Sequence, residues 1–173
     1  MGGAGMTREM FRPLRAAAVG PEGRHERLEA TPEERAALVG RLGLLGLDSL
    51  TAEIDLQPAP GGAIRGRGTL RAAVVQECVV TLEPVPQTVE APLDWRLLPP
   101  GEEPSDELDD GPDEIEVEAD GSYDLGEALV QDLSLSLDPY PRAPGAELPS
   151  EAADRKPSPF DALRALRSIP KPG

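Results

Sequence analysis

The sequence predicts an α+β fold in which an antiparallel-rich sheet packs with two amphipathic helices, together with an acidic loop and a flexible C-terminal tail. Residues 50–57 alternate between apolar and polar side chains, which is the period of a half-buried strand. The Pro-Ala-Pro-Gly-Gly run at 58–62 predicts a turn, so the next strand returns antiparallel. Helix-start signals stand before and after this β-rich part of the chain.

The second strand begins at Ala63 and carries its apolar side chains at alternate positions. Gly66 and Gly68 lie within it, where a bulge or a close backbone approach is expected. Further strands are predicted at 79–82, 89–97 and 114–118, and weaker ones at 11–14 and 26–31.

Two helices are predicted from their capping patterns. Thr31, Pro32 and Glu34 form a capping box with proline at the first helical position, and Gly43 is a natural C-terminal stop. Asp124 and Glu127 repeat the capping spacing ahead of a leucine-rich face that ends before Pro139. Both helices have one apolar side and are expected to pack on the sheet.

The length of 173 residues fits one domain with appendages. We expect this domain to span residues 8–142 and to include a disordered acidic loop at 99–113. A proline-rich linker at 143–157 and a short tail helix at 158–169 follow. Phe160, Leu163 and Leu166 share one side of that helix and are candidates for docking on a partner.

The net charge of −15 is unevenly distributed. Residues 72–141 hold 19 acidic side chains and a single basic one, Arg96, and 11 of those carboxylates lie within 101–120. Such a segment attracts basic partners. Its acidic residues lack the order and spacing of a calcium-binding loop, so no metal site is predicted.

Catalytic function is not predicted. The one histidine, His25, lies among charged residues, and Cys78 follows Glu77 with no adjacent cation to activate its thiol. Cys78 is therefore expected to be buried in a strand. No phosphate-binding glycine loop, cofactor motif, leader or membrane-spanning run is found, which predicts a cytoplasmic protein without a cofactor or small-molecule substrate.

Arg65, Arg67 and Arg71 alternate along the second strand and are the candidate contact with RNA. No aromatic residue interleaves with them, so any such contact is to the phosphate backbone. The alternative, which we favour, is that Glu53 and Asp55 on the paired strand form solvated ion pairs with this stripe.

Several segments together resemble one family. Gly66-x-Gly68-x-Leu70, the octapeptide 78–85, Asp-Leu-Gly-Glu at 124–127, Leu-Asp-Pro-Tyr-Pro-Arg at 137–142 and the tail at 159–166 occur in the order seen in the YceD family, the large ribosomal RNA subunit accumulation proteins, of the alphaproteobacterial type. The motif residues singled out are Cys78, Thr81, Glu83, Pro84, Asp138, Pro139, Tyr140, Pro141 and Arg142.

This resemblance implies a role in 23S rRNA accumulation and assembly of the large ribosomal subunit. Many members of that family carry additional cysteines that suggest a metal site, and this chain has none of them. The hypothesis is a non-catalytic factor that binds a ribosomal protein or a large-subunit precursor, and direct contact of the arginines with rRNA is a further alternative. The competing hypothesis is an acidic protein-interaction module unrelated to ribosomes.

Overall fold

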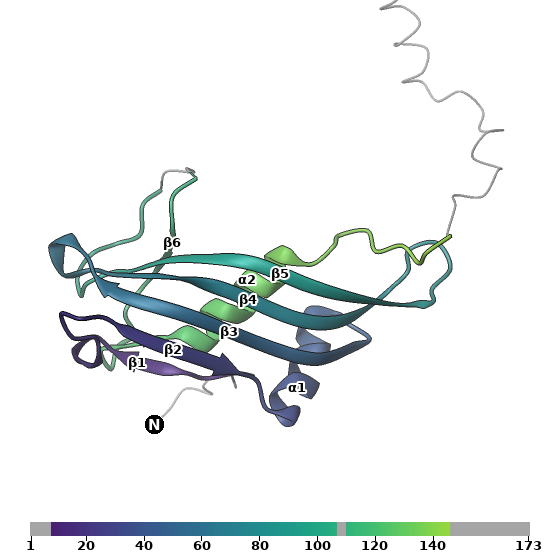
Figure 1. The fold of residues 1–173 in the computed structure, drawn as a ribbon, viewed down its shortest axis with the longest axis horizontal. Helices are drawn as coiled ribbons and strands as arrows, with labels where there is room; N and C mark the ends of the chain where they lie inside the picture. The colour runs from purple at the N-terminus through teal and green to yellow at the C-terminus, as the bar shows by residue number, and fades with distance from the viewer. Residues whose placement is uncertain (1–7, 107–109, 146–173) are drawn as a thin grey trace, which may run out of the picture.

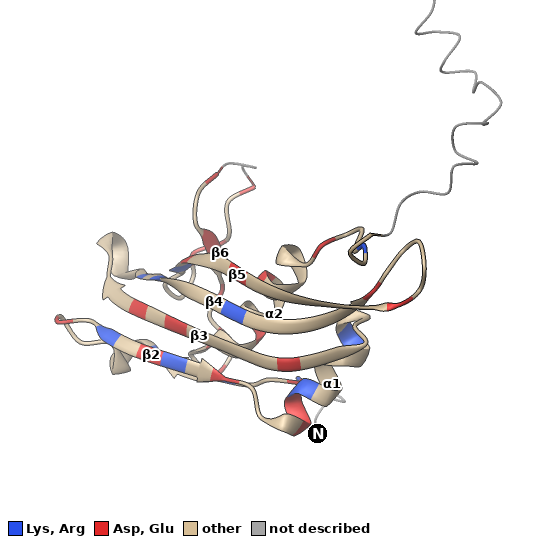
Figure 2. Ribbon diagram, turned by 45° about the vertical axis from the view of Figure 1, so that its right-hand side comes forward, with Lys and Arg blue, Asp and Glu red and all other residues tan. Residues whose placement is uncertain are grey.

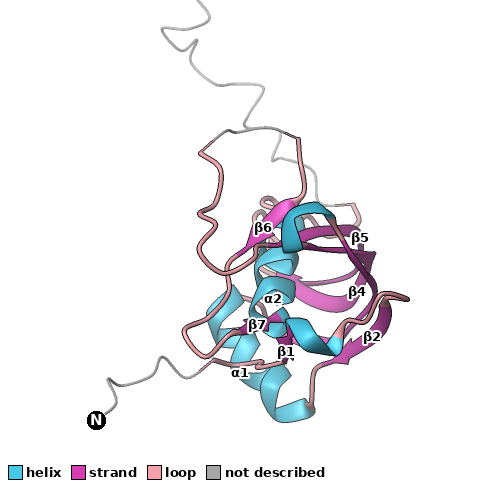
Figure 3. Cartoon of the chain, turned by 90° about the vertical axis from the view of Figure 1, so that its left-hand side faces the viewer, coloured by secondary structure: helices cyan, strands magenta, loops and turns pink. Residues whose placement is uncertain are grey.

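The computed structural model describes residues 8–106 and 110–145. Five strands in the order β2-β3-β4-β5-β6 form the main sheet, and β1 and β7 form a small second sheet. The two helices lie on one side of the main sheet, so the domain has two layers (Figure 1, Figure 3). The predicted α+β fold is confirmed.

The three longest strands follow one another in the chain as an antiparallel meander. They are β3 (Gly46–Pro58), β4 (Ile64–Glu77) and β5 (Pro84–Leu97). A short 3-10 turn, Pro60–Gly62, connects the first two where the sequence predicts a turn. β2 (Arg24–Glu29) pairs antiparallel with β3, and β6 (Asp113–Ile115) pairs parallel with the end of β5.

The small sheet positions the second helix. β1 (Pro13–Arg15) pairs antiparallel with β7 (Ser122–Asp124), and a 3-10 turn, Ala16–Ala18, follows β1. α2 (Leu125–Ser136) begins directly after β7, and the amide of Leu125 donates to the carbonyl of Arg12 at 2.9 Å. The first described residues are thereby tied to the start of α2.

Only one face of the main sheet is buried. The alternating side chains Leu50, Ile54 and Leu56 of β3 lie in the core, while their odd-numbered neighbours face outward. α2 covers this face and adds Leu129 and Leu133 to the same core (Figure 1). Each large apolar side chain buried in this way contributes roughly 1.5–3 kcal/mol, so this face supplies the main stabilising term.

Both helix starts are formed as predicted. The Thr31 hydroxyl accepts from the Glu34 amide and the Glu34 carboxylate accepts from the Thr31 amide, ahead of α1 (Pro32–Leu42). α1 ends at Gly43, whose φ of 66° is the left-handed conformation that glycine adopts without cost. The Asp124 carboxylate accepts from the amides of Gly126 and Glu127 and caps α2.

The prediction of a strand at 79–82 is wrong. Residues 79–81 form a turn, and the next strand, β5, starts at Pro84. The last proline within β5 is Pro92, eight positions later. Proline lacks an amide hydrogen and is tolerated on a strand edge that needs no donor. Since β6 pairs only with residues 95–97, this part of β5 is such an edge within the described chain.

The predicted strand at 114–118 is shorter and forms β6. Of the predicted linker, only residues up to Gly145 belong to the described part of the chain. The tail helix at 158–169, with Phe160, Leu163 and Leu166, lies outside the described residues and stays a prediction.

The close backbone approach expected at the β4 glycines occurs at Gly68. A Cβ atom placed on Gly68 would lie 1.9 Å from the carbonyl oxygen of Glu53 on β3, and one on Gly66 would lie 3.0 Å from the Leu56 side chain. β3 and β4 keep a regular register here; their one shift lies between Leu47 and Ser49. Gly68 therefore permits the β3–β4 contact without a bulge.

Gly68→Ala should destabilise the domain because the new methyl group overlaps a strand backbone that cannot yield cheaply. We expect a loss of about 2 kcal/mol or more in the free energy of unfolding, measured by urea denaturation. Gly40→Ala is the matched control, since nothing lies within 4 Å of its Cβ position on α1, and it should gain up to about 1 kcal/mol. Equal midpoints for the two variants would contradict this packing.

Candidate interaction surfaces

Charged residues of both signs lie along the strands of the main sheet (Figure 2), and those on its outward face are exposed or half-buried. On this face Arg27 of β2 lies opposite Glu53 of β3, Asp55 of β3 lies opposite Arg67 of β4, and Arg67 and Arg71 of β4 lie opposite Asp94 and Glu90 of β5. Opposite charges on adjacent strands attract, so this face neutralises itself.

The arginine stripe is engaged by β5. The Arg65 guanidinium donates twice to the Asp94 carboxylate, at 2.6 and 2.7 Å, and this contact lowers the pKa of Asp94. Arg67 lies 3.7 Å from the same carboxylate, and Arg71 lies 3.6 Å from Glu90.

The stripe forms ion pairs within the sheet, but its acidic partners lie on β5 and not on β3 as the sequence predicts. Asp55 is directly opposite Arg67 in the register, yet its carboxylate pairs with His25 of β2 at 2.8 Å. That hydrogen bond is the main cause of the raised pKa of His25. β4 is a central strand, and both of its neighbours, β3 and β5, carry carboxylates. The alternation of residues alone does not show which of these strands supplies the partners of the arginines.

Two hollows are found at the sheet. One of about 380 Å³ lies over the outward face between His25 and Arg71, where charges of both signs line it. A groove of about 580 Å³ lies between β1 and β2, beside Phe11 and four arginines. Three of these arginines are already paired, Arg12 with Glu34, Arg24 with Glu26 and Arg27 with Glu29. Neither hollow concentrates unpaired charge.

The two separated motifs 78–85 and 137–142 meet in the structure. The Val79 amide donates to the Pro141 carbonyl at 2.9 Å, and the Gln76 side chain donates to the Asp138 carbonyl at 2.9 Å. We call the turn 78–83 together with residues 138–143 the motif junction. Hydrogen bonds from both sides fix it at the far end of the β4–β5 hairpin (Figure 1).

Cys78 is buried, as expected, but it lies in this turn and not in a strand. Its sulfur accepts from the amides of Ala143 at 3.3 Å and Thr81 at 3.4 Å. The Thr81 side chain and these amides lower the pKa of the thiol to about 7. The thiol therefore has a lowered pKa without an adjacent cation, because the Thr81 side chain and backbone amides donate to it.

An acidic pair that the sequence did not reveal links α2 to the base of the acidic loop. The indole nitrogen of Trp95 donates to the Asp132 carboxylate at 2.5 Å. Asp113, the first residue of β6, also acts on Asp132, and its carboxyl group contributes to raising the pKa of Asp132. Burial is the main reason that the pKa of Asp132 is raised to about 6.

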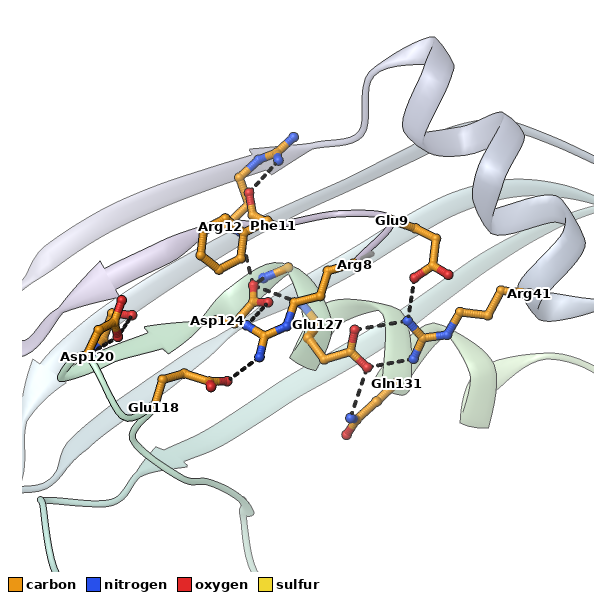
Figure 4. A network of polar contacts seen from close by, with 12 residues as sticks. Arg8, Glu9, Phe11, Arg12, Arg41, Glu118, Asp120, Asp124, Glu127 and Gln131 are labelled. Carbon is orange, nitrogen blue, oxygen red and sulfur yellow. Dashed lines mark hydrogen bonds and ion pairs between the residues drawn. The ribbon is translucent and has the colours of Figure 1, made fainter. Parts of the chain in front are cut away.

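A polar network fastens residues 8–12 to both helices (Figure 4). Asp124 is buried and accepts from the Arg8 side chain and the Arg12 amide, both at 3.0 Å, in addition to capping α2. Arg41 of α1 bridges Glu9 and Glu127, and its contact with Glu127 is the main cause of the lowered pKa of that carboxyl group. The guanidinium groups of Arg8, Arg12 and Arg41 are therefore all engaged in contacts within the domain.

Among residues 8–106 and 110–145, no group of three histidine, cysteine, aspartate or glutamate side chains is arranged to hold a metal ion. No helix in the described part of the chain is long and apolar enough to cross a membrane. The geometry there defines an α+β domain with charged and apolar side chains exposed on its surface.

Comparison with known families assigns the chain to one of them. The family described as Large ribosomal RNA subunit accumulation protein YceD matches residues 66–167, from β4 to the tail. The chain belongs to the YceD family, so the resemblance seen in the motifs is confirmed. No curated protein and no solved structure matches.

Replacing Arg65, Arg67 and Arg71 together with Gln should leave RNA affinity unchanged, because Asp94 and Glu90 already occupy these guanidinium groups. Filter binding or band-shift titration of the variant against wild type, at several salt concentrations, measures this. Weaker binding with a flatter salt dependence would instead identify the stripe as a phosphate contact.

Asp132→Asn should remove a pH-dependent step near pH 6. The raised pKa means that the folded state holds the proton more tightly than the unfolded state, so stability falls as pH rises from about 4 through about 6. The asparagine stays uncharged, which abolishes that fall. Fluorescence of Trp95, the only tryptophan, and urea denaturation at both ends of the range measure it. Asp48→Asn is the control and should retain the wild-type pH profile; a wild-type titration without a step would contradict the assignment.

Proposed function

We propose that this protein is a non-catalytic, cytoplasmic factor that supports 23S rRNA accumulation by binding a basic component of the large ribosomal subunit or its precursor, foremost a ribosomal protein. Family membership supports the link to large-subunit rRNA. The observation that carries the mode of binding is the separation of paired cations from unpaired carboxylates.

The basic side chains of the described chain are mostly occupied. Nine of its arginines form ion pairs with carboxylates: Arg8, Arg12, Arg24, Arg27, Arg41, Arg65, Arg67, Arg71 and Arg96. A guanidinium held by a carboxylate has little attraction left for a phosphate. This favours a protein partner over RNA as the first contact.

The acidic surplus is concentrated around the loop. Glu103, Asp106 and Asp110 are exposed and make no ion pair with any described residue, whereas Glu102 and Glu114 share Arg96. The loop projects away from the sheet and the helices (Figure 1). A cluster of free carboxylates on a projecting loop attracts basic proteins over several ångströms and speeds their association.

This arrangement also explains why we propose binding and not catalysis. Carboxylates in acid–base catalysis need an environment that separates their pKa values in a water-poor cleft. Asp132 has such a raised pKa, but its carboxylate accepts from the indole nitrogen of Trp95, which is buried in the core. We infer that this pair is a structural link.

Changing Glu103 to Gln and Asp106 and Asp110 to Asn should weaken co-sedimentation with large-subunit precursors by about tenfold at low salt, because three unpaired charges are lost. The wild-type affinity should fall with added salt, and that of the variant should depend on salt less. Affinity is measured by sedimentation of tagged, purified chain with precursor particles.

The control variant carries Glu22→Gln, Asp48→Asn and Glu53→Gln, which remove equal charge from exposed positions away from the loop. It should bind like wild type. Equal weakening of both variants would reduce the effect to net charge and contradict a specific acidic site. Normal 23S rRNA and normal subunit profiles after depletion of the protein would favour an interaction module unrelated to ribosomes.

A further inference from the structure

The motif junction exposes large apolar side chains. Val79, Leu82 and Tyr140 are 50%, 68% and 71% exposed, and they belong to two segments that hydrogen bonds hold side by side. Single exposed apolar residues are common, but three on two segments that hydrogen bonds join indicate an interaction surface.

Leu82 is exposed and also has an unfavourable backbone conformation. Its φ of 63° is the only positive φ among the non-glycine residues of the described chain. A left-handed conformation costs a leucine roughly 1–2 kcal/mol, and glycine or asparagine would adopt it more readily. Leu82 is neither buried nor suited to its turn, so its side chain is better explained by a contact made outside the described residues.

The rim of the junction is acidic. Glu77 and Glu83 are exposed and form no ion pair with a described residue, and Asp138 is exposed beside Tyr140. Arg142 is the one basic side chain of the junction. An occupant of this surface must therefore combine apolar side chains with positive charge.

The chain itself contains such an occupant. Residues 158–173 carry Phe160, Leu163 and Leu166 at helical spacing, three basic residues and a single acidic one. The described chain ends at Gly145, two residues after Ala143 bonds to Cys78. A linker of the intervening length has a root-mean-square span of about 20 Å, and tethering of this kind gives effective concentrations in the millimolar range.

We propose that residues 158–169 fold back as a short amphipathic helix on the motif junction of the same chain. Phe160, Leu163 and Leu166 lie against Val79, Leu82 and Tyr140, while Arg164 and Arg167 face the acidic rim. This intramolecular contact does not depend on the proposed ribosomal role.

NMR relaxation of the full-length protein tests the contact. In wild type we expect backbone order parameters of about 0.8 for residues 160–166, close to those of a folded domain, and in Leu82→Asn and Tyr140→Ser values below about 0.6. Asparagine suits the positive φ, so Leu82→Asn should at the same time unfold at higher urea concentration than wild type. Loss of docking with a gain in stability separates the contact from misfolding.

The control is Leu135→Ser, which removes an 82% exposed leucine from α2 and should leave the tail ordered. Phe160→Ser should shift the amide signals of Val79 and Tyr140. Low order parameters in wild type would overturn the proposal, as would an ordered tail whose Phe160→Ser change leaves the junction unshifted. Order that disappears on dilution would assign the surface to a second copy of the chain and overturn the intramolecular contact.

Discussion

Burial of a single face of the β3–β4–β5 meander is the constraint on which the rest of the structure depends. One face packs on α2 and forms the core, so the opposite face is left to solvent and its charges pair with one another. The same long hairpin carries its turn to the segment that follows α2, where residues 138–143 bind it. Core, neutral face and motif junction all follow from this one-sided packing.

The sequence predicts those features whose causes are local. The caps at Thr31 and Asp124 involve only groups within three residues along the chain. The uninterrupted alternation of apolar and polar residues predicts β3. Both are formed as predicted. The close backbone approach at Gly68 is also predictable from the sequence, because glycine within a strand often marks a bulge or a close approach of another backbone.

Features that depend on distant residues were not predictable in this way. The segment 79–82 has strand-forming residues, yet its amides bond to Pro141 and to Cys78 itself, and a turn results. Asp94 is 29 positions from Arg65, and nothing in the spacing shows that it, and not Asp55, takes the arginine. The Trp95–Asp132 contact joins a strand to a helix across the acidic loop.

Charge pairing connects the fold to the proposed function. The sheet face and the N-terminal network use most arginines internally, so the net charge of −15 is expressed chiefly around the acidic loop. A domain built in this way offers carboxylates to a basic partner and has little free positive charge for nucleic acid. The family motifs at 78–85 and 137–142, in contrast, lie at the other end of the hairpin and form a separate surface with exposed apolar side chains.

Carboxyl footprinting of the complex tests this division of surfaces most directly. Full-length protein is labelled with a carbodiimide and an amine, alone and bound to large-subunit precursor particles, and modification is quantified by mass spectrometry. The account predicts protection of Glu103, Asp106 and Asp110 in the complex, with Glu53 on the outward sheet face labelled equally in both states. Protection of Glu53 with no change at the loop would contradict it.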